Sequence, residues 1–371
     1  MLRLGLLLSP VIALVLFRYP AVSMEPLPAL AHLESSSLAE PGSVTAKMTV
    51  QILHREEGKR KIYRNGRLYD LPEEAKERKV FVPDRAQGYL LFERMGKEIE
   101  HRSHSGELFW QRESSAYPVA SPDGDIILLI TGDSNRVDVM DRNGILVEGS
   151  ALSGSLLVDY SFAVPEERAE TGASALVVFS DGHYYLLGPG GKLLYRDVFS
   201  KKPVFARSAG ISPDGKTFAI HFDQDGKDHV QLFELDASED GYSVSRSFDS
   251  ELGNVHPYTV AMAVQGETVV LAPPGETISI RNGSVELDRL YEAGENPSLH
   301  KAMGSLGQVF LIQEKNRVLI IDDRGQLLGS FAMSALFSAG RFLPHGDRLL
   351  YHNLNGQFRL FQLTSESGSV E

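Results

Sequence analysis

Short apolar runs separated by polar turns cover most of the chain after residue 48. The clearest unit predicts four strands, at Tyr117–Ala120, Ile126–Thr131, Val137–Asp141 and Ile145–Glu148. The second strand is apolar at nearly every position, as expected for a strand packed on both faces, whereas the third alternates and the fourth is short and more polar. No long helix is predicted after the N-terminal segment. The pattern therefore predicts small antiparallel sheets that each end in an edge strand.

A repeated turn precedes the second strand of these units. Ser121-Pro122-Asp123-Gly124 stands before one apolar run, Ser212-Pro213-Asp214-Gly215 stands before a second run at Thr217–Phe222, and Leu343–Asp347 is a weaker copy. In such a turn serine accepts a local hydrogen bond, proline presets φ, and glycine allows the chain to enter the next strand. The copies predict a repeat of one small sheet.

A second turn signal recurs at a nearly constant spacing. Asn-Gly, Gly-Gly and related pairs favour tight hairpins, and they place glycines at positions 66, 106, 144, 191, 241, 283 and 325, which are 38 to 50 residues apart. This period matches one four-stranded sheet per repeat. Sheets of this size bury a core only by stacking on their neighbours.

The end of the series indicates how the repeats close. Three last strands are predicted, near Phe337–Leu343, Arg348–His352 and Gln357–Leu363, and they lack a fourth. The hairpin around Tyr63–Leu71 is expected to supply it and to close a ring with main-chain hydrogen bonds. The sequence thus predicts an all-β chain with a seven-bladed β-propeller of four-stranded antiparallel blades over residues 48–365. A further strand at Thr49–His54 leaves eight blades open.

The Ser-Pro-Asp-Gly turns followed by apolar strands resemble the WD40-like repeats of bacterial exported β-propellers of the TolB-propeller type. The resemblance spans about residues 78–365; there is no Trp-Asp dipeptide, and the only tryptophan is Trp110. The hairpin Ser105–Trp110 is also similar to one quinoprotein-type repeat. Families of this kind imply a rigid ring that presents loops to protein partners, and they share no single chemistry.

Both ends of the chain are predicted to lie outside the ring. Residues 1–23 combine Arg3, the uncharged stretch Leu4–Phe17 and the small residues Ala21-Val22-Ser23, which is typical of an export signal. An uncleaved N-terminal membrane anchor is the alternative, because Arg18 precedes the expected cut. Residues 24–47 are expected to form a flexible linker, and residues 366–371 a disordered tail.

Composition narrows the classes of partner. The 371 residues carry a net charge of −12, which argues against nucleic acid and anionic membrane surfaces, because phosphate binding needs clustered lysine and arginine. The basic run Lys59-Arg60-Lys61 is interpreted as a solvated strand edge. The absence of cysteine excludes disulfides, thiol catalysis and cysteine-bound zinc.

Two groups of residues that resemble ligand sets have simpler interpretations. His101 and His104 would point to opposite faces of a strand, so they are interpreted as edge-strand histidines rather than as ligands of one metal. Asp223, Asp225, Asp228 and His229 lack the ligand spacing of an EF-hand calcium loop. They are expected in a solvated hairpin turn.

Other motifs also favour structure over chemistry. The glycine-rich stretch Leu187–Gly191 is predicted to be a tight turn, because no helix follows it to bind a phosphate. Asn282-Gly283-Ser284 matches a glycosylation acceptor, but a hairpin accounts for it. A quinone-dependent enzyme would need several tryptophans, and the chain has no nucleophile elbow or dinucleotide fingerprint. No catalytic, cofactor-binding or metal-binding residue is assigned, and no cofactor is expected.

The sequence therefore favours a non-enzymatic cell-envelope propeller, periplasmic or otherwise outside the cytoplasm. It is expected to be a monomeric ring that acts as a protein–protein interaction scaffold for an unidentified envelope partner, with membrane contact only through an uncleaved N-terminus. The alternative is a metal-dependent hydrolase or lactonase of the β-propeller type, with a site in the central channel. A carbohydrate-binding propeller is a third hypothesis, but Tyr184, Tyr185 and Tyr195 lie at strand-like positions.

Overall fold

The computed structural model describes residues 29–36, 51–56, 59–64, 67–93, 96–239, 241–273, 276–290, 303–306, 309–314, 317–322, 327–332, 340–345, 348–353 and 358–364. The predicted export signal or anchor at 1–23 and the predicted tail at 366–371 lie outside these residues. The described residues form strands, turns and two short 3-10 helices, and the all-β prediction is confirmed. None of the helices in these ranges is long and apolar enough to cross a membrane.

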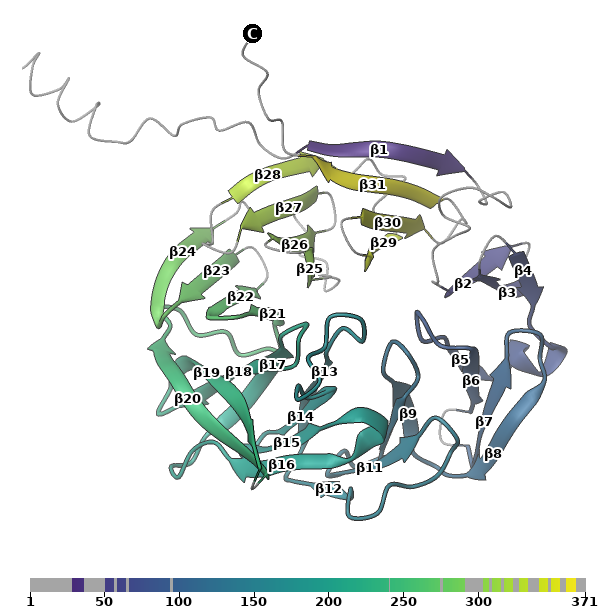
Figure 1. The fold of residues 1–371 in the computed structure, drawn as a ribbon, viewed down its shortest axis with the longest axis horizontal. Coiled ribbons are helices and arrows are strands. Elements are labelled where there is room, and N and C mark those ends of the chain that lie inside the picture. The colour runs from purple at the N-terminus through teal and green to yellow at the C-terminus, as the bar shows by residue number, and fades with distance from the viewer. Residues whose placement is uncertain are drawn as a thin grey trace, which may run out of the picture.

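Eight antiparallel sheets are arranged in a ring (Figure 1), and we call them blades I to VIII. Blade I contains β2 (Gln51–Glu56), β3 (Lys59–Arg64) and β4 (Arg67–Asp70), followed by the 3-10 helix η2 (Glu73–Lys76). Blade II contains β5 (Lys79–Phe81), β6 (Gly88–Phe92), β7 (Glu98–Ser103) and β8 (Leu108–Glu113). Blade III contains β9 (Tyr117–Ala120), β10 (Ile126–Ile130), β11 (Arg136–Asp141) and β12 (Leu152–Ser153). Blade IV contains β13 (Leu157–Phe162), β14 (Ala175–Phe179), β15 (His183–Leu187), the 3-10 helix η3 (Pro189–Gly191) and β16 (Leu193–Val198).

The second half of the ring repeats the same plan. Blade V contains β17 (Phe205–Ile211), β18 (Thr217–Gln224), β19 (Lys227–Ser238) and β20 (Gly241–Glu251). Blade VI contains β21 (Ala261–Gln265), β22 (Thr268–Ala272), β23 (Glu276–Arg281) and β24 (Ser284–Leu290). Blade VII contains β25 (Met303–Leu306), β26 (Val309–Glu314), β27 (Arg317–Asp322) and β28 (Leu327–Ala332). Blade VIII contains β29 (Gly340–His345), β30 (Arg348–Asn353), β31 (Phe358–Thr364) and β1 (Ala29–Ser36).

Seven of these sheets have four strands, and blade I has three in the described part of the chain. In Figure 1 the first strands of blades II to VIII lie nearest the centre of the ring. First strands of successive blades touch, as β13 touches β17 and β17 touches β21. The predicted propeller architecture is confirmed, and the eighth sheet that the sequence left open is present as blade I.

The ring is closed by a different strand from the one expected. β1 pairs antiparallel with β31, from Ala29 opposite Thr364 to Ser36 opposite Phe358, and so supplies the fourth strand of blade VIII. The hairpin at 63–71 instead belongs to blade I, so its prediction as the closing strand was wrong. Part of the predicted 24–47 linker is therefore a strand. An edge strand with unpaired main-chain groups recruits whichever extended segment reaches it, and sequence pattern alone did not identify that segment.

The fourth strand of blade III also differs from the prediction. The amide of Asp141 and the carbonyl of Ile145 pair across a turn, but the chain then leaves the ladder at Gly149, which has a φ of +73°. Pairing resumes only at β12. Before Gly149, Leu146 bridges Met140, and the Val147 amide donates to the Val139 carbonyl at 2.9 Å. The predicted segment at 145–148 therefore pairs with β11 in part, but it is too short to form the fourth strand, which is β12.

The Ser-Pro-Asp-Gly turns have the same hydrogen bonds in both copies. The hydroxyl of Ser212 donates to Asp214 at 2.5 Å and accepts from the amide of Thr217 at 3.0 Å, and Ser121 makes the equivalent bonds at 2.6 and 3.0 Å. The Gly215 amide closes the turn onto the Ser212 carbonyl at 2.9 Å. The predicted turn mechanism is confirmed.

Each of these turns also joins two blades. The carbonyl of Pro122 accepts a bond from the amide of Arg85 in blade II, and the carbonyl of Pro213 accepts one from the amide of Val164 in blade IV. At Gly215, where φ is +72°, a Cβ would lie 2.1 Å from the Ala173 carbonyl oxygen. The repeated turn therefore links neighbouring blades through a main-chain hydrogen bond.

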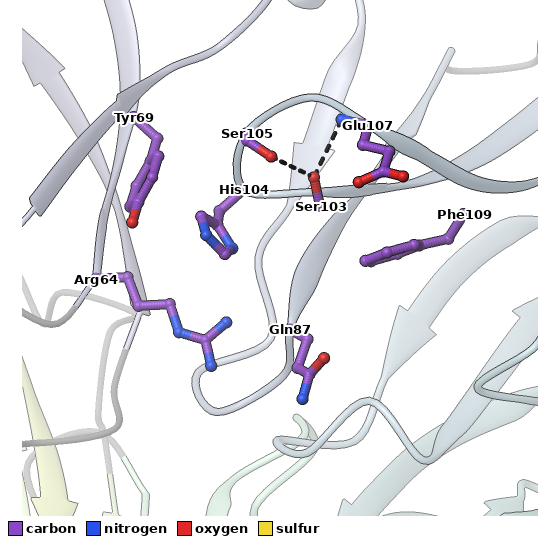
Figure 2. Close-up of a pocket in the computed structure, with 8 residues that line it drawn as sticks. All are labelled: Arg64, Tyr69, Gln87, Ser103, His104, Ser105, Glu107 and Phe109. Atoms are coloured by element: carbon purple, nitrogen blue, oxygen red, sulfur yellow. Dashed lines mark hydrogen bonds between the residues drawn. The ribbon is translucent and has the colours of Figure 1, made fainter.

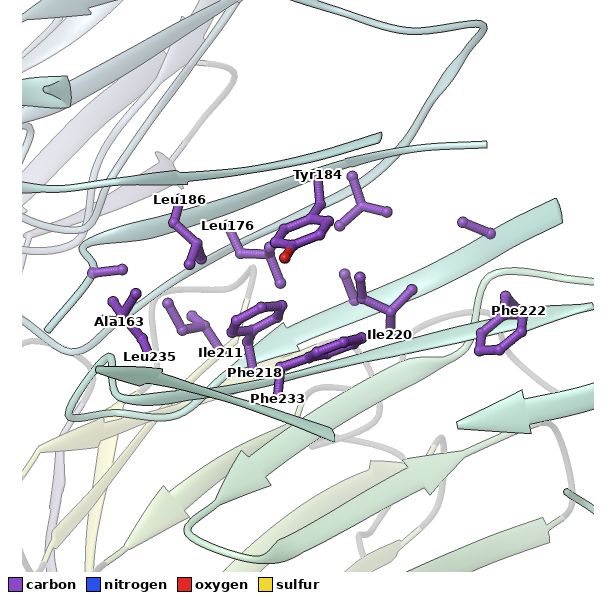
Figure 3. Packing of buried hydrophobic residues seen from close by; sticks show 14 residues of the cluster. Ala163, Leu176, Tyr184, Leu186, Ile211, Phe218, Ile220, Phe222, Phe233 and Leu235 are labelled. Atoms are coloured by element: carbon purple, nitrogen blue, oxygen red, sulfur yellow. The ribbon is translucent and has the colours of Figure 1, made fainter. Parts of the chain in front are cut away.

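The hydrophobic core is divided among the interfaces between successive blades. All five residues of β6, β14 and β22 are buried, as predicted for second strands covered on both faces. Between blades IV and V, Tyr184 lies 5.4 Å from Phe218, which stacks on Phe233 at 5.0 Å (Figure 3). Burying one such side chain contributes roughly 1.5–3 kcal/mol. Face-to-face stacking thus stabilises sheets that are too small to fold alone.

Candidate functional site

The structure separates the two histidines that lie three residues apart in the sequence. His101 lies in β7, an inner strand of blade II, and His104 lies in the turn after it, so the edge-strand interpretation was wrong. The ring of His101 lies 5.0 Å from Phe109 and 5.4 Å from Trp110, whereas that of His104 lies 4.3 Å from Tyr69 of blade I. The two rings face different aromatic neighbours.

Both histidines are held in the neutral form. Burial lowers the pKa of His101 to about 4. Burial, reinforced by the charge of Arg64, also lowers the pKa of His104. The Nδ1 atom of each ring is buried without a hydrogen-bond partner in the part of the chain that the structure describes. At neutral pH both rings therefore act as uncharged packing groups.

Two hollows adjoin Phe109 on one loop face of blades I to III. The larger, with a volume of about 560 Å³, lies between blades II and III, and His101, Trp110 and Arg142 contribute to its wall. The smaller, of about 390 Å³, lies between blades I and II, where Arg64 and Tyr69 face the turn that follows β7 (Figure 2). Phe109 and Gln87 line both hollows. Phe109 is 47% exposed, and its ring lies between the two hollows, which are lined mostly by polar residues. We call this exposed apolar ring the Phe109 ridge.

Contacts between blades keep this face rigid. The indole N–H of Trp110 donates to the Arg142 carbonyl at 2.9 Å, and the ring covers Gly144, where a Cβ would lie 2.7 Å from the indole. Asp125 accepts bonds from Arg142 and from the Gly190 amide, both at 2.6 Å. Burial alone would raise the pKa of Asp125, but these two bonds hold it below its usual value. Blades II, III and IV are thus cross-linked beside the hollows.

The aspartate-rich hairpin of blade V is only partly the solvated turn that was expected. Asp225 and Gly226 form the exposed turn between β18 and β19, with φ values of +56° and +79°. Asp228, in contrast, is fully buried in β19, so its prediction as a solvated residue was wrong. His229 stacks on Phe222 at 5.4 Å.

Asp228 is the centre of a buried ionic cluster that sequence reasoning missed. Its carboxylate lies 2.6 Å from Arg207 Nη1 and 3.0 Å from His221 Nε2, and it accepts the amide of His256 at 2.5 Å. Arg207 also donates to the His256 carbonyl at 2.6 Å. These bonds tie the loop between β20 and β21 to blade V. The cluster is a structural brace, because every charged group in it bonds to another part of the fold.

The glycine-rich stretch and the motif that resembles a glycosylation acceptor also have structural roles. The stretch Leu187–Gly191 is the turn containing η3, as predicted, and its Gly190 amide is used by Asp125. Asn282 and Gly283 form the tight turn between β23 and β24, with φ values of +49° and +78°. Among the described residues no group of three or more histidine, aspartate or glutamate side chains is arranged to hold a metal ion.

Comparison with known proteins identifies the fold class. No protein-family model matches the chain, and no curated protein matches its sequence. Solved structures do match: the chain is similar to BamB from Moraxella catarrhalis, with a TM-score of 0.55 and 14% identity over 92% of this chain and 100% of that one. The computationally designed Ika8 protein matches with a TM-score of 0.54 and 12% identity over 91% and 100%. The Dos1 propeller matches with a TM-score of 0.53 and 11% identity over 86% and 90%. The chain is a β-propeller of four-stranded antiparallel blades, consistent with the WD40-like type. At 11–14% sequence identity, the structural similarity establishes the fold and nothing further.

Proposed function

We propose that this protein is a non-enzymatic β-propeller of the cell envelope that acts as a protein-interaction scaffold. The observation that carries the proposal is the exposed Phe109 ridge between two hollows, on a face built from three successive blades. Large exposed aromatics beside pockets are typical of protein-binding surfaces, where they bury apolar area at little cost in conformational entropy. The assignment to the envelope rests on the export-signal pattern in residues 1–23.

The rigidity of this face favours binding over chemistry. Trp110 is fixed to Arg142, and Asp125 is fixed to Arg142 and Gly190, so the walls are already in place before a partner arrives. A surface that is ordered in advance loses less conformational entropy on association. The two neutral histidines add contact area without a charge that would have to be desolvated.

Capture from envelope extracts tests the proposal. Purified full-length protein and the Phe109→Ser variant are compared, with Tyr258→Ser as a matched control. Tyr258 is 70% exposed and lies in the loop before β21, away from the ridge. A partner that is retained by the wild type and by Tyr258→Ser, but lost with Phe109→Ser, supports the scaffold. Equal recovery by all three proteins contradicts the assigned face.

Export is tested separately. The mass of the mature N-terminus in the native host is expected to correspond to removal of residues 1–23, or to an intact chain in the membrane fraction if the segment is an anchor. An intact chain in the cytosol would contradict the envelope assignment.

A further inference from the structure

The outer edge of blade I combines outward-pointing main-chain amides with a pair of arginine side chains. Within the described residues blade I has three strands, and β4 is the outermost, because the step from β3 to β4 matches the step from the third to the fourth strand of the other blades. Within the described residues no strand pairs with the outer side of β4, and no main-chain hydrogen bond is made to it there. An edge of this kind is a template for another extended chain.

The pairing of β3 with β4 shows which main-chain groups are directed outward. The register places Arg64 opposite Arg67, Tyr69 opposite Ile62, and Asp70 opposite Lys61. The Leu71 amide donates to the Arg60 carbonyl at 3.1 Å, which marks that pair as a hydrogen-bonded one. Hydrogen-bonded and non-bonded pairs alternate in an antiparallel ladder, so the amides of Leu68 and Asp70 point away from β3. Two donors are thus presented at the edge.

Two positively charged side chains lie at one end of one face of this edge. Arg64 and Arg67 stand directly opposite each other, and neither makes an ion pair with another described residue. Like charges in directly opposed positions are destabilising in a sheet. The same face carries Tyr69, which contacts His104, and Arg64 reaches into the smaller hollow beside it (Figure 2). In a protein with a net charge of −12, the two arginines concentrate positive charge at this edge, and Glu107 is the one carboxylate among the residues that line the smaller hollow.

We propose that the outer edge of β4 accepts an additional strand from an acidic segment of a partner protein. The partner's main chain pairs with the outward groups of Leu68 and Asp70, and a carboxylate on the alternate positions pairs with Arg64 and Arg67. This mode gives affinity through the main chain and specificity through every second side chain. The inference rests on the proposed scaffold function, and it names the chemistry of the partner.

The assay uses two fluorescent seven-residue peptides and the full-length protein. One peptide alternates threonine with glutamate, and the other alternates threonine with lysine. The acidic peptide is expected to bind at least about fivefold more tightly, and its affinity is expected to fall as salt is added. In hydrogen exchange, the Leu68 and Asp70 amides are expected to be unprotected in the free protein and protected in the complex.

A matched pair of variants isolates the main-chain contact. Asp70→Pro removes an outward amide without removing a bond to β3, whereas Asp70→Asn keeps that amide, and both lose the same carboxylate. Asp70→Pro is expected to weaken peptide binding by about tenfold relative to Asp70→Asn. Arg67→Glu is expected to reverse the preference to the lysine peptide.

Three results would overturn the inference. Equal binding by Asp70→Pro and Asp70→Asn would show that the edge is not used. Equal binding of the two peptides would remove the charge argument. Protection of the Leu68 and Asp70 amides in the free protein would show that the edge is already occupied by this chain or by a second copy. Equal envelope capture by the wild type, Phe109→Ser and Tyr258→Ser would contradict the scaffold face but not the use of the β4 edge, because the peptide assay contains no other protein.

Discussion

The buried carboxylate of Asp228 offers the sharpest test of how the ring is held together. Asp228→Asn keeps the side-chain volume but removes the charge that faces Arg207 at 2.6 Å and His221 at 3.0 Å. Removing one partner from a buried ion pair costs about 3–5 kcal/mol. Arg207 retains Asp223 at 3.1 Å and the His256 carbonyl, so we expect the lower end, about 3 kcal/mol. This is a large part of the roughly 5–15 kcal/mol that stabilises a typical domain.

Equilibrium unfolding in urea at pH 7 measures this loss. Asp225→Asn is the control, because Asp225 lies exposed in the turn of the same hairpin and asparagine tolerates its left-handed backbone. The control is expected to stay within about 0.5 kcal/mol of the wild type. A cost below about 1 kcal/mol for Asp228→Asn, or equal costs for both variants, would refute the view that this cluster braces the ring.

The pH dependence of the same variant adds an independent check. Burial alone would raise the pKa of Asp228, but the bonds from His221 and the His256 amide and the charge of Arg207 hold it below its usual value. A carboxyl whose pKa is lowered by folding stabilises the protein above its unfolded pKa of about 4, and this contribution is lost as the pH falls through the folded pKa. Asp228→Asn is therefore expected to lose less stability on acidification than the wild type.

Three further predictions concern an interblade turn, the side chain of His101 and the strand that closes the propeller. Gly215→Ala is expected to cost about 2–4 kcal/mol in urea unfolding, because its Cβ would meet the Ala173 carbonyl, whereas Gly226→Ala, with open space around it, is expected to cost about 1 kcal/mol. Burial lowers the pKa of His101 to about 4, so the folded state favours its neutral form. The free energy of unfolding is therefore expected to fall as the pH drops from about 6.5 towards 4. His101→Leu is expected to make this free energy depend less on pH between about pH 4 and 7. Deletion of residues 1–36 removes β1, and hydrogen exchange is expected to show faster opening of β31 than of the strands of blade IV.

The repeat and its turns were determined by local sequence. The bonds of Ser121 and Ser212 reach only a few residues along the chain, so the same four residues fold in the same way in both blades. The apolar second strands were equally clear, because a strand buried on both faces leaves an unbroken apolar run. These two signals were enough to predict a ring of stacked sheets.

Contacts between distant segments were decided only by the tertiary structure. Asp228 resembles its exposed neighbour Asp225 in sequence, and it is buried because Arg207 and His256, from two other segments, come to meet it. The Phe109 ridge and the open edge of β4 likewise depend on which blades lie beside them. Local patterns encode hydrogen bonds and alternation within a strand. The choice of β1 to close the ring depended on the free energy of pairing two segments more than 300 residues apart, which no local pattern records.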